Sequence, residues 1–163
     1  MWEPIPFDLE ETYDVVVAMD VVEHIEDDRE ALNWMADRLE PGGVLFTTVP
    51  AYQWLFSEHD VALHHFRRYT ASQFTRALPT FVEVLRCGYF NSILFPVAAS
   101  VRLAKKLVGN SNARPARKQS GLMPAPVNAL FQSVLDSEVW AIRRGFDLPF
   151  GLSVYCLARR IHR

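Results

Sequence analysis

The sequence predicts an α/β fold whose opening third runs strand, helix, strand. Two apolar runs suit buried strands, one at Tyr13–Met19 and one at Val44–Val49, and helical spacing lies between them. Elements in this order form a crossover unit with two parallel strands. Half of the 163 residues are hydrophobic, which is enough for one domain with its own core.

The first strand should lie in the interior of its sheet, because Tyr13–Met19 is a nearly unbroken β-branched run. Asp27, followed three residues later by Glu30, predicts a helix N-cap and a capping box. The Pro-Gly-Gly sequence at residues 41–43 predicts the end of that helix. One face of the helix should carry Leu32, Met35 and Leu39.

The rest of the chain continues the alternation of helices and strands. Thr70 and Gln73 form a second capping-box pattern. Residues 109–121 are polar and basic, so we expect a mobile loop there. The predicted elements are a helix from Thr70 to about Leu78, strands at Val82–Phe90 and Leu152–Arg159, and helices at 93–108 and 126–144.

The predicted helix at 93–108 is amphipathic and has two interpretations. It is too short to cross a bilayer, which takes about 20 apolar residues. It could be a lid helix packed on the sheet with a basic face in solvent. It could instead rest on an anionic membrane surface near a lipid-linked substrate. The apolar face carries Val97, Val101, Ala104 and Val108, and the basic residues are Arg102, Lys105 and Lys106.

Charge and cysteine content narrow the functional classes. A formal net charge of −2 gives no global basic field, so a nucleic-acid partner is not expected. Cys87 and Cys156 lie in apolar, strand-like stretches without a CxxC spacing, which predicts reduced core residues. The first residues lack the basic flank and apolar run of a signal peptide, so we expect a cytoplasmic location.

Four segments taken together resemble the class I S-adenosylmethionine-dependent methyltransferases. They are PIPF, YDVVVAMDVVEHI, LEPGGVLFTTVP and the late PFGLSVYCLARR. That family has a doubly wound, Rossmann-like sheet ordered 3-2-1-4-5-7-6. The resemblance implies a partial sheet here, with strands equivalent to 4-5-7-6 and flanking helices. It also implies one methyltransferase-like domain over residues 1–163, with a helical insertion at 93–145.

The sequence has no counterpart of the family's glycine-rich turn or of the acidic residue that ends its second strand. The cofactor of such folds binds at the switch point of the strand order, so half of the crevice is missing. We therefore expect a truncated gene product or half of a split protein, inactive or impaired as an isolated chain. Its first strand would be an exposed apolar edge, which can pair with another chain. The alternative function is thus a noncatalytic subunit that binds a second copy or a complementary N-terminal half.

The resemblance also implies which residues contact S-adenosylmethionine. Trp2 would lie beside the adenine, while Met19, Asp20 and Val21 would line the methionine end. The alternatives are a terminal aromatic without an ordered site for Trp2 and a polar cap at the strand end for Asp20.

The loop after the second strand should bind a small-molecule or lipid-linked acceptor. Two adjacent arginines suit a carboxylate or phosphate, although a solvated loop end is the alternative. The predicted acceptor-binding residues are Asp60, His64, Arg67, Arg68 and Tyr69.

Methyl transfer needs an aligned acceptor and, for a hydroxyl, a base that removes its proton. The candidate catalytic bases are His24 and His65, with a packing role as the alternative for His24. The spacing of His59, His64 and His65 matches no standard zinc pattern, so the sequence predicts no metal site.

Overall fold

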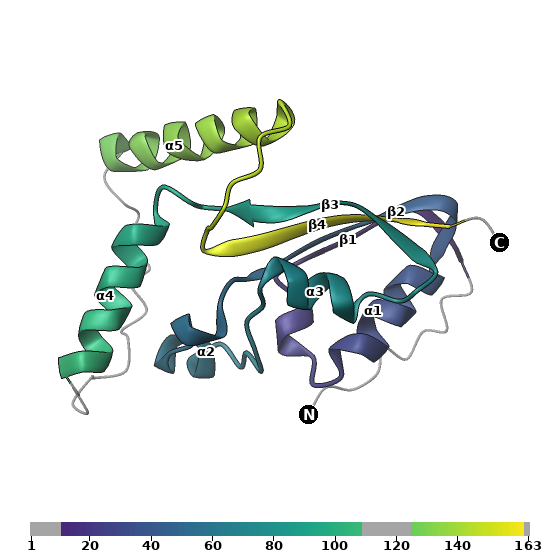
Figure 1. Cartoon of the computed structure of the whole chain (residues 1–163), viewed down its shortest axis with the longest axis horizontal. Helices are drawn as coiled ribbons and strands as arrows, with labels where there is room; N and C mark the ends of the chain where they lie inside the picture. The colour runs from purple at the N-terminus through teal and green to yellow at the C-terminus, as the bar shows by residue number, and fades with distance from the viewer. Residues whose placement is uncertain (1–10, 109–124, 162–163) are drawn as a thin grey trace.

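The computed structural model describes residues 11–108 and 125–161, and Figure 1 shows their arrangement. Their four-stranded sheet has the order β1-β2-β4-β3. β1 and β2 are parallel, while β4 runs antiparallel to both β2 and β3. In the numbering of the methyltransferase sheet this order is 4-5-7-6, as predicted. The strands are β1 (Tyr13–Met19), β2 (Leu39–Pro50), β3 (Val82–Phe90) and β4 (Ser153–Arg160).

The helices divide into two groups around this sheet. In Figure 1, α1 and α3 cover one face of the sheet, α4 lies beyond the end to which the β3 arrow points, and α5 is drawn above that end. Three short helices, η1, η2 and α2, fold segments in which the sequence predicted no helix. The helices are η1 (Val22–His24), α1 (Asp28–Asp37), η2 (Gln53–Leu55), α2 (Glu58–Ala62), α3 (Ala71–Ala77), α4 (Phe95–Val108) and α5 (Ala125–Arg143).

Two predicted helix starts are confirmed. The Asp27 side chain caps α1 by accepting a hydrogen bond of 2.9 Å from the backbone N–H of Glu30, which gives the predicted N-cap without the full capping box. Thr70 and Gln73 form a full capping box at the start of α3. Because each cap satisfies backbone groups that would otherwise be orphaned, these short polar patterns fix where the helices begin.

The predicted end of the first helix is wrong. α1 ends at Asp37, and residues 41–43 lie inside β2, where its register with β1 shifts. The reason is a close approach of two backbones, since a Cβ on Gly43 would lie 3.0 Å from the carbonyl oxygen of Tyr13. The glycine therefore serves strand pairing rather than helix termination.

The core lies between one face of the sheet and helices α1 and α3. Cys156 is buried opposite the half-buried Cys87 on neighbouring strands, and both remain thiols, as predicted. Burying each large apolar side chain contributes roughly 1.5–3 kcal/mol. The fully buried apolar members include Leu32, Leu39, Leu45, Val49, Phe74 and Val154.

The interior position that the β-branched run predicted for the first strand is wrong for the part of the chain described, whereas the exposed apolar edge that the resemblance implied is confirmed there. β1 lies at an edge of this sheet, and Val15, Val17 and Met19 are each 58% exposed. The opposite face of β1 contributes Ala18 to the core. A β-branched run marks a strand, but it does not reveal how many neighbours the strand has, because the same residues suit an edge and an interior.

The predicted packing of the 93–108 helix is also wrong. Val97 and Val101 are exposed, so this apolar face does not lie on the sheet. α4 is held at η2 instead, where Nη1 of Arg102 donates to the Leu55 carbonyl at 2.7 Å. The loop predicted at 109–121 falls outside the described residues. Within the described parts of the chain, no helix is long and apolar enough to span a membrane.

Gly151→Ala should destabilise the fold, because the added Cβ would lie 2.1 Å from the backbone oxygen of Phe90. We expect the free energy of unfolding to fall by about 1–3 kcal/mol, measured by urea denaturation. Gly88→Ala is the matched control, since its new Cβ would meet the Tyr155 side chain at 3.0 Å, which can move aside. An equal or larger loss for Gly88→Ala would contradict this account.

Candidate functional site

Backbone strain marks the candidate site. It lies where β1, β2 and β3 have their carboxyl ends, which we call the carboxyl edge of the sheet, as distinct from the edge strand β1. β1, β2 and β3 are parallel to one another, because β2 and β3 are both antiparallel to β4, so their carboxyl ends share this edge. A non-glycine residue with positive φ follows each of these strands: Asp20 (φ 52°), Tyr52 (φ 59°) and Asn91 (φ 61°). Such conformations cost of order 1–3 kcal/mol and cluster at functional sites.

Asp20 is fixed at the end of β1 by the neighbouring strand. Its backbone N–H donates to the Thr48 carbonyl at 2.9 Å, and the Thr48 hydroxyl lies 3.4 Å from Oδ1 of Asp20. Met19 and Val21 are exposed on either side of it. The structure thus brings these three predicted cofactor residues together at the strand end, while Trp2 lies outside the described residues.

The loop that follows β2 leaves the sheet and returns to the same point. The Tyr69 N–H donates to the Pro50 carbonyl at 2.9 Å, and the Tyr52 N–H donates to the Tyr69 carbonyl at 2.8 Å. The loop between these anchors contains α2 and all the residues predicted to bind the acceptor. Closure by backbone bonds therefore holds this group at the carboxyl edge.

A buried carboxylate organises the interior of the loop. Asp60 is fully buried, and its Oδ1 lies 2.6 Å from Nη2 and 2.7 Å from Nε of Arg68. Its Oδ2 accepts bonds from the backbone N–H and the hydroxyl of Ser57 at 2.9 and 3.0 Å. Burial acts to raise the pKa of Asp60, but Arg68 and the other donors outweigh it and hold that pKa below its usual value. The carboxylate is therefore charged and paired inside the protein.

His65 and His24 lie next to each other beside this carboxylate. Nδ1 of His65 is 3.1 Å from Oδ1 of Asp60, and the two imidazole rings are 4.5 Å apart and nearly perpendicular. Burial lowers the pKa of His65 below its ordinary value, against the opposing effect of Asp60. At neutral pH the ring is thus neutral, with Nδ1–H facing Asp60 and Nε2 left as a base.

Glu23, which no sequence pattern singled out, belongs to the same cluster. It is 1% exposed, neither carboxylate oxygen has a hydrogen-bond partner among the described residues, and burial raises its pKa to about 7. The backbone N–H of Phe66 donates to the Glu23 carbonyl at 2.8 Å and ties the loop to η1. The signal in the sequence was its position directly before His24.

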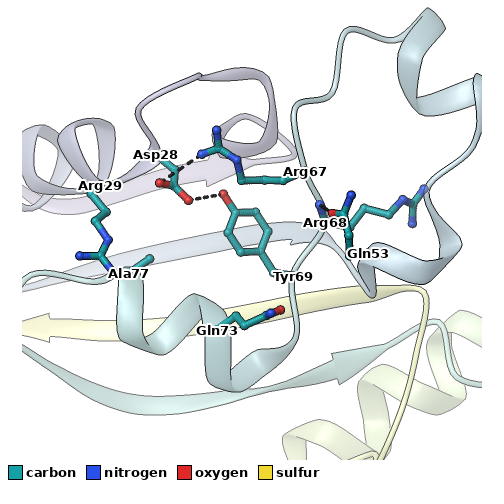
Figure 2. Close-up of a pocket in the computed structure, with 8 residues that line it drawn as sticks. All are labelled: Asp28, Arg29, Gln53, Arg67, Arg68, Tyr69, Gln73 and Ala77. Carbon is teal, nitrogen blue, oxygen red and sulfur yellow. Dashed lines mark hydrogen bonds and ion pairs between the residues drawn. The ribbon is translucent and has the colours of Figure 1, made fainter.

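Arg67 and Tyr69 share a second carboxylate, Asp28, at the start of α1. Asp28 lies 3.1 Å from Nη1 of Arg67 and 2.7 Å from the Tyr69 hydroxyl, which donates to it. Figure 2 shows the Asp28 carboxylate linked to both side chains. Burial, together with Asp28, raises the pKa of Tyr69, so the phenol stays protonated. These residues line an open pocket of about 330 Å³. His64 is exposed and outside this group.

An aromatic cluster that sequence reasoning missed lies at the same edge. The rings of Tyr52 and Tyr89 stack with their centroids 5.3 Å apart. The ring centroid of Phe95, at the start of α4, lies 5.5 Å from that of Tyr52. The ring centroid of Phe95 also lies 6.1 Å from that of Trp54 and 5.2 Å from that of Phe150. These residues come from four separate segments, so no spacing along the chain indicates the cluster.

The strand order and the position of this edge agree with a known family. Residues 2–83, just over half of the chain, match the family described as a methyltransferase domain. The chain belongs to this methyltransferase family. S-adenosylmethionine, the cofactor that the sequence predicts, fits that assignment. No curated protein sequence matches the chain.

Solved structures share the fold of this methyltransferase domain at low sequence identity. One is the Haloferax volcanii protein in complex with the Trm112 methyltransferase activator, with TM-score 0.50 and 15% identity, over 98% of this chain and 58% of that one. The [4+2]-cyclase SpnF gives TM-score 0.50 and 17% identity, over 98% and 53% of the two chains. Coclaurine N-methyltransferase gives TM-score 0.51 and 15% identity, over 95% of this chain and 50% of that one. The chain thus spans little more than half the length of these proteins.

Arg68→Met should unfold the domain far more readily than Arg67→Met. The first change leaves the buried Asp60 charge without its main partner, and such losses cost about 3–5 kcal/mol. The second change removes a partly exposed pair with Asp28, for which about 1 kcal/mol or less is expected. Urea denaturation of both variants measures the difference. Equal effects would show that the Asp60–Arg68 pair does not organise the loop.

Proposed function

We propose that this methyltransferase domain takes part in methyl transfer from S-adenosylmethionine to a small-molecule or lipid-linked acceptor at the carboxyl edge of its sheet. The observation that carries this proposal is the strand order equivalent to 4-5-7-6 in a chain that belongs to the family. The strained strand ends and the histidine pair lie at the edge where ligands of doubly wound sheets bind.

The end of β1 suits one part of the cofactor. Asp20 offers a carboxylate between the exposed apolar side chains of Met19 and Val21. A carboxylate flanked in this way fits a ligand that carries an ammonium group next to methylene groups, as the methionine end of S-adenosylmethionine does. We therefore keep these three residues as the proposed cofactor contacts.

The acceptor side divides into contacting and positioning residues. His65 and His24 are the proposed bases, and the exposed His64 and partly exposed Arg67 are the proposed contacts to the acceptor. The buried residues predicted for acceptor binding instead position this group: Asp60, Arg68 and Tyr69.

S-adenosylmethionine supplies a methyl group that is already electrophilic because it is attached to a sulfonium. The residues of this chain have to align an acceptor oxygen with that carbon and take the oxygen's proton. Nε2 of His65 is suited to this, since Nδ1 faces Asp60 at 3.1 Å and Asp60 is fixed by Arg68. The aromatic cluster around Tyr52 provides apolar surface for an acceptor at the same edge.

Titration of the purified chain with S-adenosylhomocysteine tests the cofactor site. We expect saturable binding that Asp20→Ala weakens at least about tenfold, since charge-assisted contacts contribute roughly 1.5–3 kcal/mol. Asp14→Ala is the matched control, because Asp14 is an exposed aspartate at the opposite end of β1. A folded chain that binds nothing, or that loses as much affinity with Asp14→Ala, would contradict this assignment.

The exposed face of β1 favours a second candidate function, that of a noncatalytic subunit that binds a partner through this strand. β1 presents Val15, Val17 and Met19 at a sheet edge, and an edge strand offers unpaired backbone groups for pairing with a second copy or a complementary half. The similar Haloferax volcanii protein is bound to an activator.

A cytoplasmic location and contact of the exposed α4 face with a membrane stay predictions.

A double substitution tests this second function. Val15→Glu with Val17→Glu should abolish self-association of the chain in sedimentation velocity, because charge on an edge strand opposes pairing. Val97→Glu on α4 is the control, since Val97 is equally apolar and exposed. A chain that sediments as a monomer before substitution would exclude a dimer through β1.

A further inference from the structure

Three side chains around the η1 turn converge on one point. Glu23 and His24 come from η1, and His65 comes from the loop after α2. One ligand atom of each lies within 4.8 Å of the others. The bond from the Phe66 N–H to the Glu23 carbonyl, 2.8 Å long, fixes the two segments against each other. The cluster is therefore assembled by the backbone and not by chance approach of surface side chains.

The carboxylate of Glu23 lacks the partner that its burial demands. The residue is 1% exposed, and both oxygens are without a hydrogen bond among the described residues. A buried carboxyl group in native proteins is paired, hydrogen-bonded or bound to a metal. Two neighbouring imidazoles and an unpaired carboxylate together indicate a cation as the missing partner.

His65 is already oriented as a metal-bound histidine is. Its Nδ1 faces Asp60 at 3.1 Å, and Asp60 is held in turn by Arg68 at 2.6 Å. Metal-ligating histidines usually donate their second ring N–H to a carboxylate, which fixes the tautomer and directs the other nitrogen to the ion. Arg68 acts to lower the pKa of His65, but Asp60 acts to raise it by more, so the pair as a whole does not oppose a cation at His65.

We propose that Glu23, His24 and His65 form a binding site for a divalent transition-metal ion, with Zn²⁺ as the best match. Two imidazole nitrogens with one carboxylate are a zinc donor set, and a fourth position is left open toward solvent on the side of the exposed His24. Of the three histidines whose spacing matches no standard zinc pattern, the site uses His65 and leaves out His59 and His64. The proposal does not rest on methyl transfer, and the base role proposed for His65 applies to the metal-free chain, because Nε2 cannot hold a proton and an ion at once.

The geometry requires only a small adjustment. Donor atoms in a tetrahedral zinc site lie about 3.3–3.6 Å apart, so the three donors have to approach by at most about 1.5 Å from their 4.8 Å limit. Rotation of the exposed His24 side chain and of the Glu23 carboxylate, which no hydrogen bond holds among the described residues, supplies this movement. His65 stays where the Asp60 contact holds it.

The test is direct metal binding to the untagged, metal-stripped chain without S-adenosylmethionine. Calorimetric titration with Zn²⁺ and the visible absorption of Co²⁺ should show one ion per chain. Glu23→Gln and His65→Ala should each weaken Zn²⁺ binding more than about 100-fold, since losing an outer partner alone costs about 10–100-fold. His59→Ala, on α2 outside the cluster, should leave the affinity unchanged.

Thermal unfolding of each variant keeps the result interpretable. Glu23→Gln should retain its fold, because an amide replaces a carboxylate that has no hydrogen-bond partner among the described residues. The proposal is overturned if the folded chain binds neither Zn²⁺ nor Co²⁺, if only Mg²⁺ binds, or if Glu23→Gln binds Zn²⁺ as tightly as the unchanged chain. Because S-adenosylhomocysteine binding is measured separately, failure here leaves the proposed function standing.

Discussion

The buried Asp60 carboxylate is the interaction on which the site depends. Its two oxygens join Ser57 at the start of α2, Arg68 near the loop's return and His65 between them. A buried charge is tolerated only when such partners are complete, so the loop has one arrangement in which all of them are satisfied. Because Arg68 also donates to the Ala51 carbonyl at 3.1 Å, this arrangement is anchored to the end of β2.

The sheet supplies the second constraint, since it sets where the loop begins and where η1 lies. Parallel pairing of β1 with β2 brings Asp20 and Thr48 to the same edge. The chain then has to turn sharply after each parallel strand, and it does so with strained residues at Asp20, Tyr52 and Asn91. The strain is retained because hydrogen bonds across the edge over-determine these turns.

Local patterns predicted the elements well, for identifiable physical reasons. The capping residues Asp27 and Thr70 predicted the starts of α1 and α3, a β-branched run predicted β1, and β1 and β3 have the bounds that the sequence predicted. Errors arose where a distant segment decides the outcome. Gly43 is needed by a neighbouring backbone, and the exposure of Val97 depends on where α4 attaches. Neither the backbone approach at Gly43 nor the attachment of α4 can be predicted from the neighbouring residues in the sequence.

The sequence by itself determined the family, the order of strands and helices, and the segments that carry the candidate site, because motifs and caps act over a few residues. Only the tertiary structure decided how those residues divide their roles. Among adjacent arginines, Arg68 is buried against Asp60, whereas Arg67 pairs with Asp28 near the surface. Folding likewise placed Glu23 beside a histidine more than forty residues away. Burial and long-range pairing are properties of the packed chain, so they could not be derived from spacing alone.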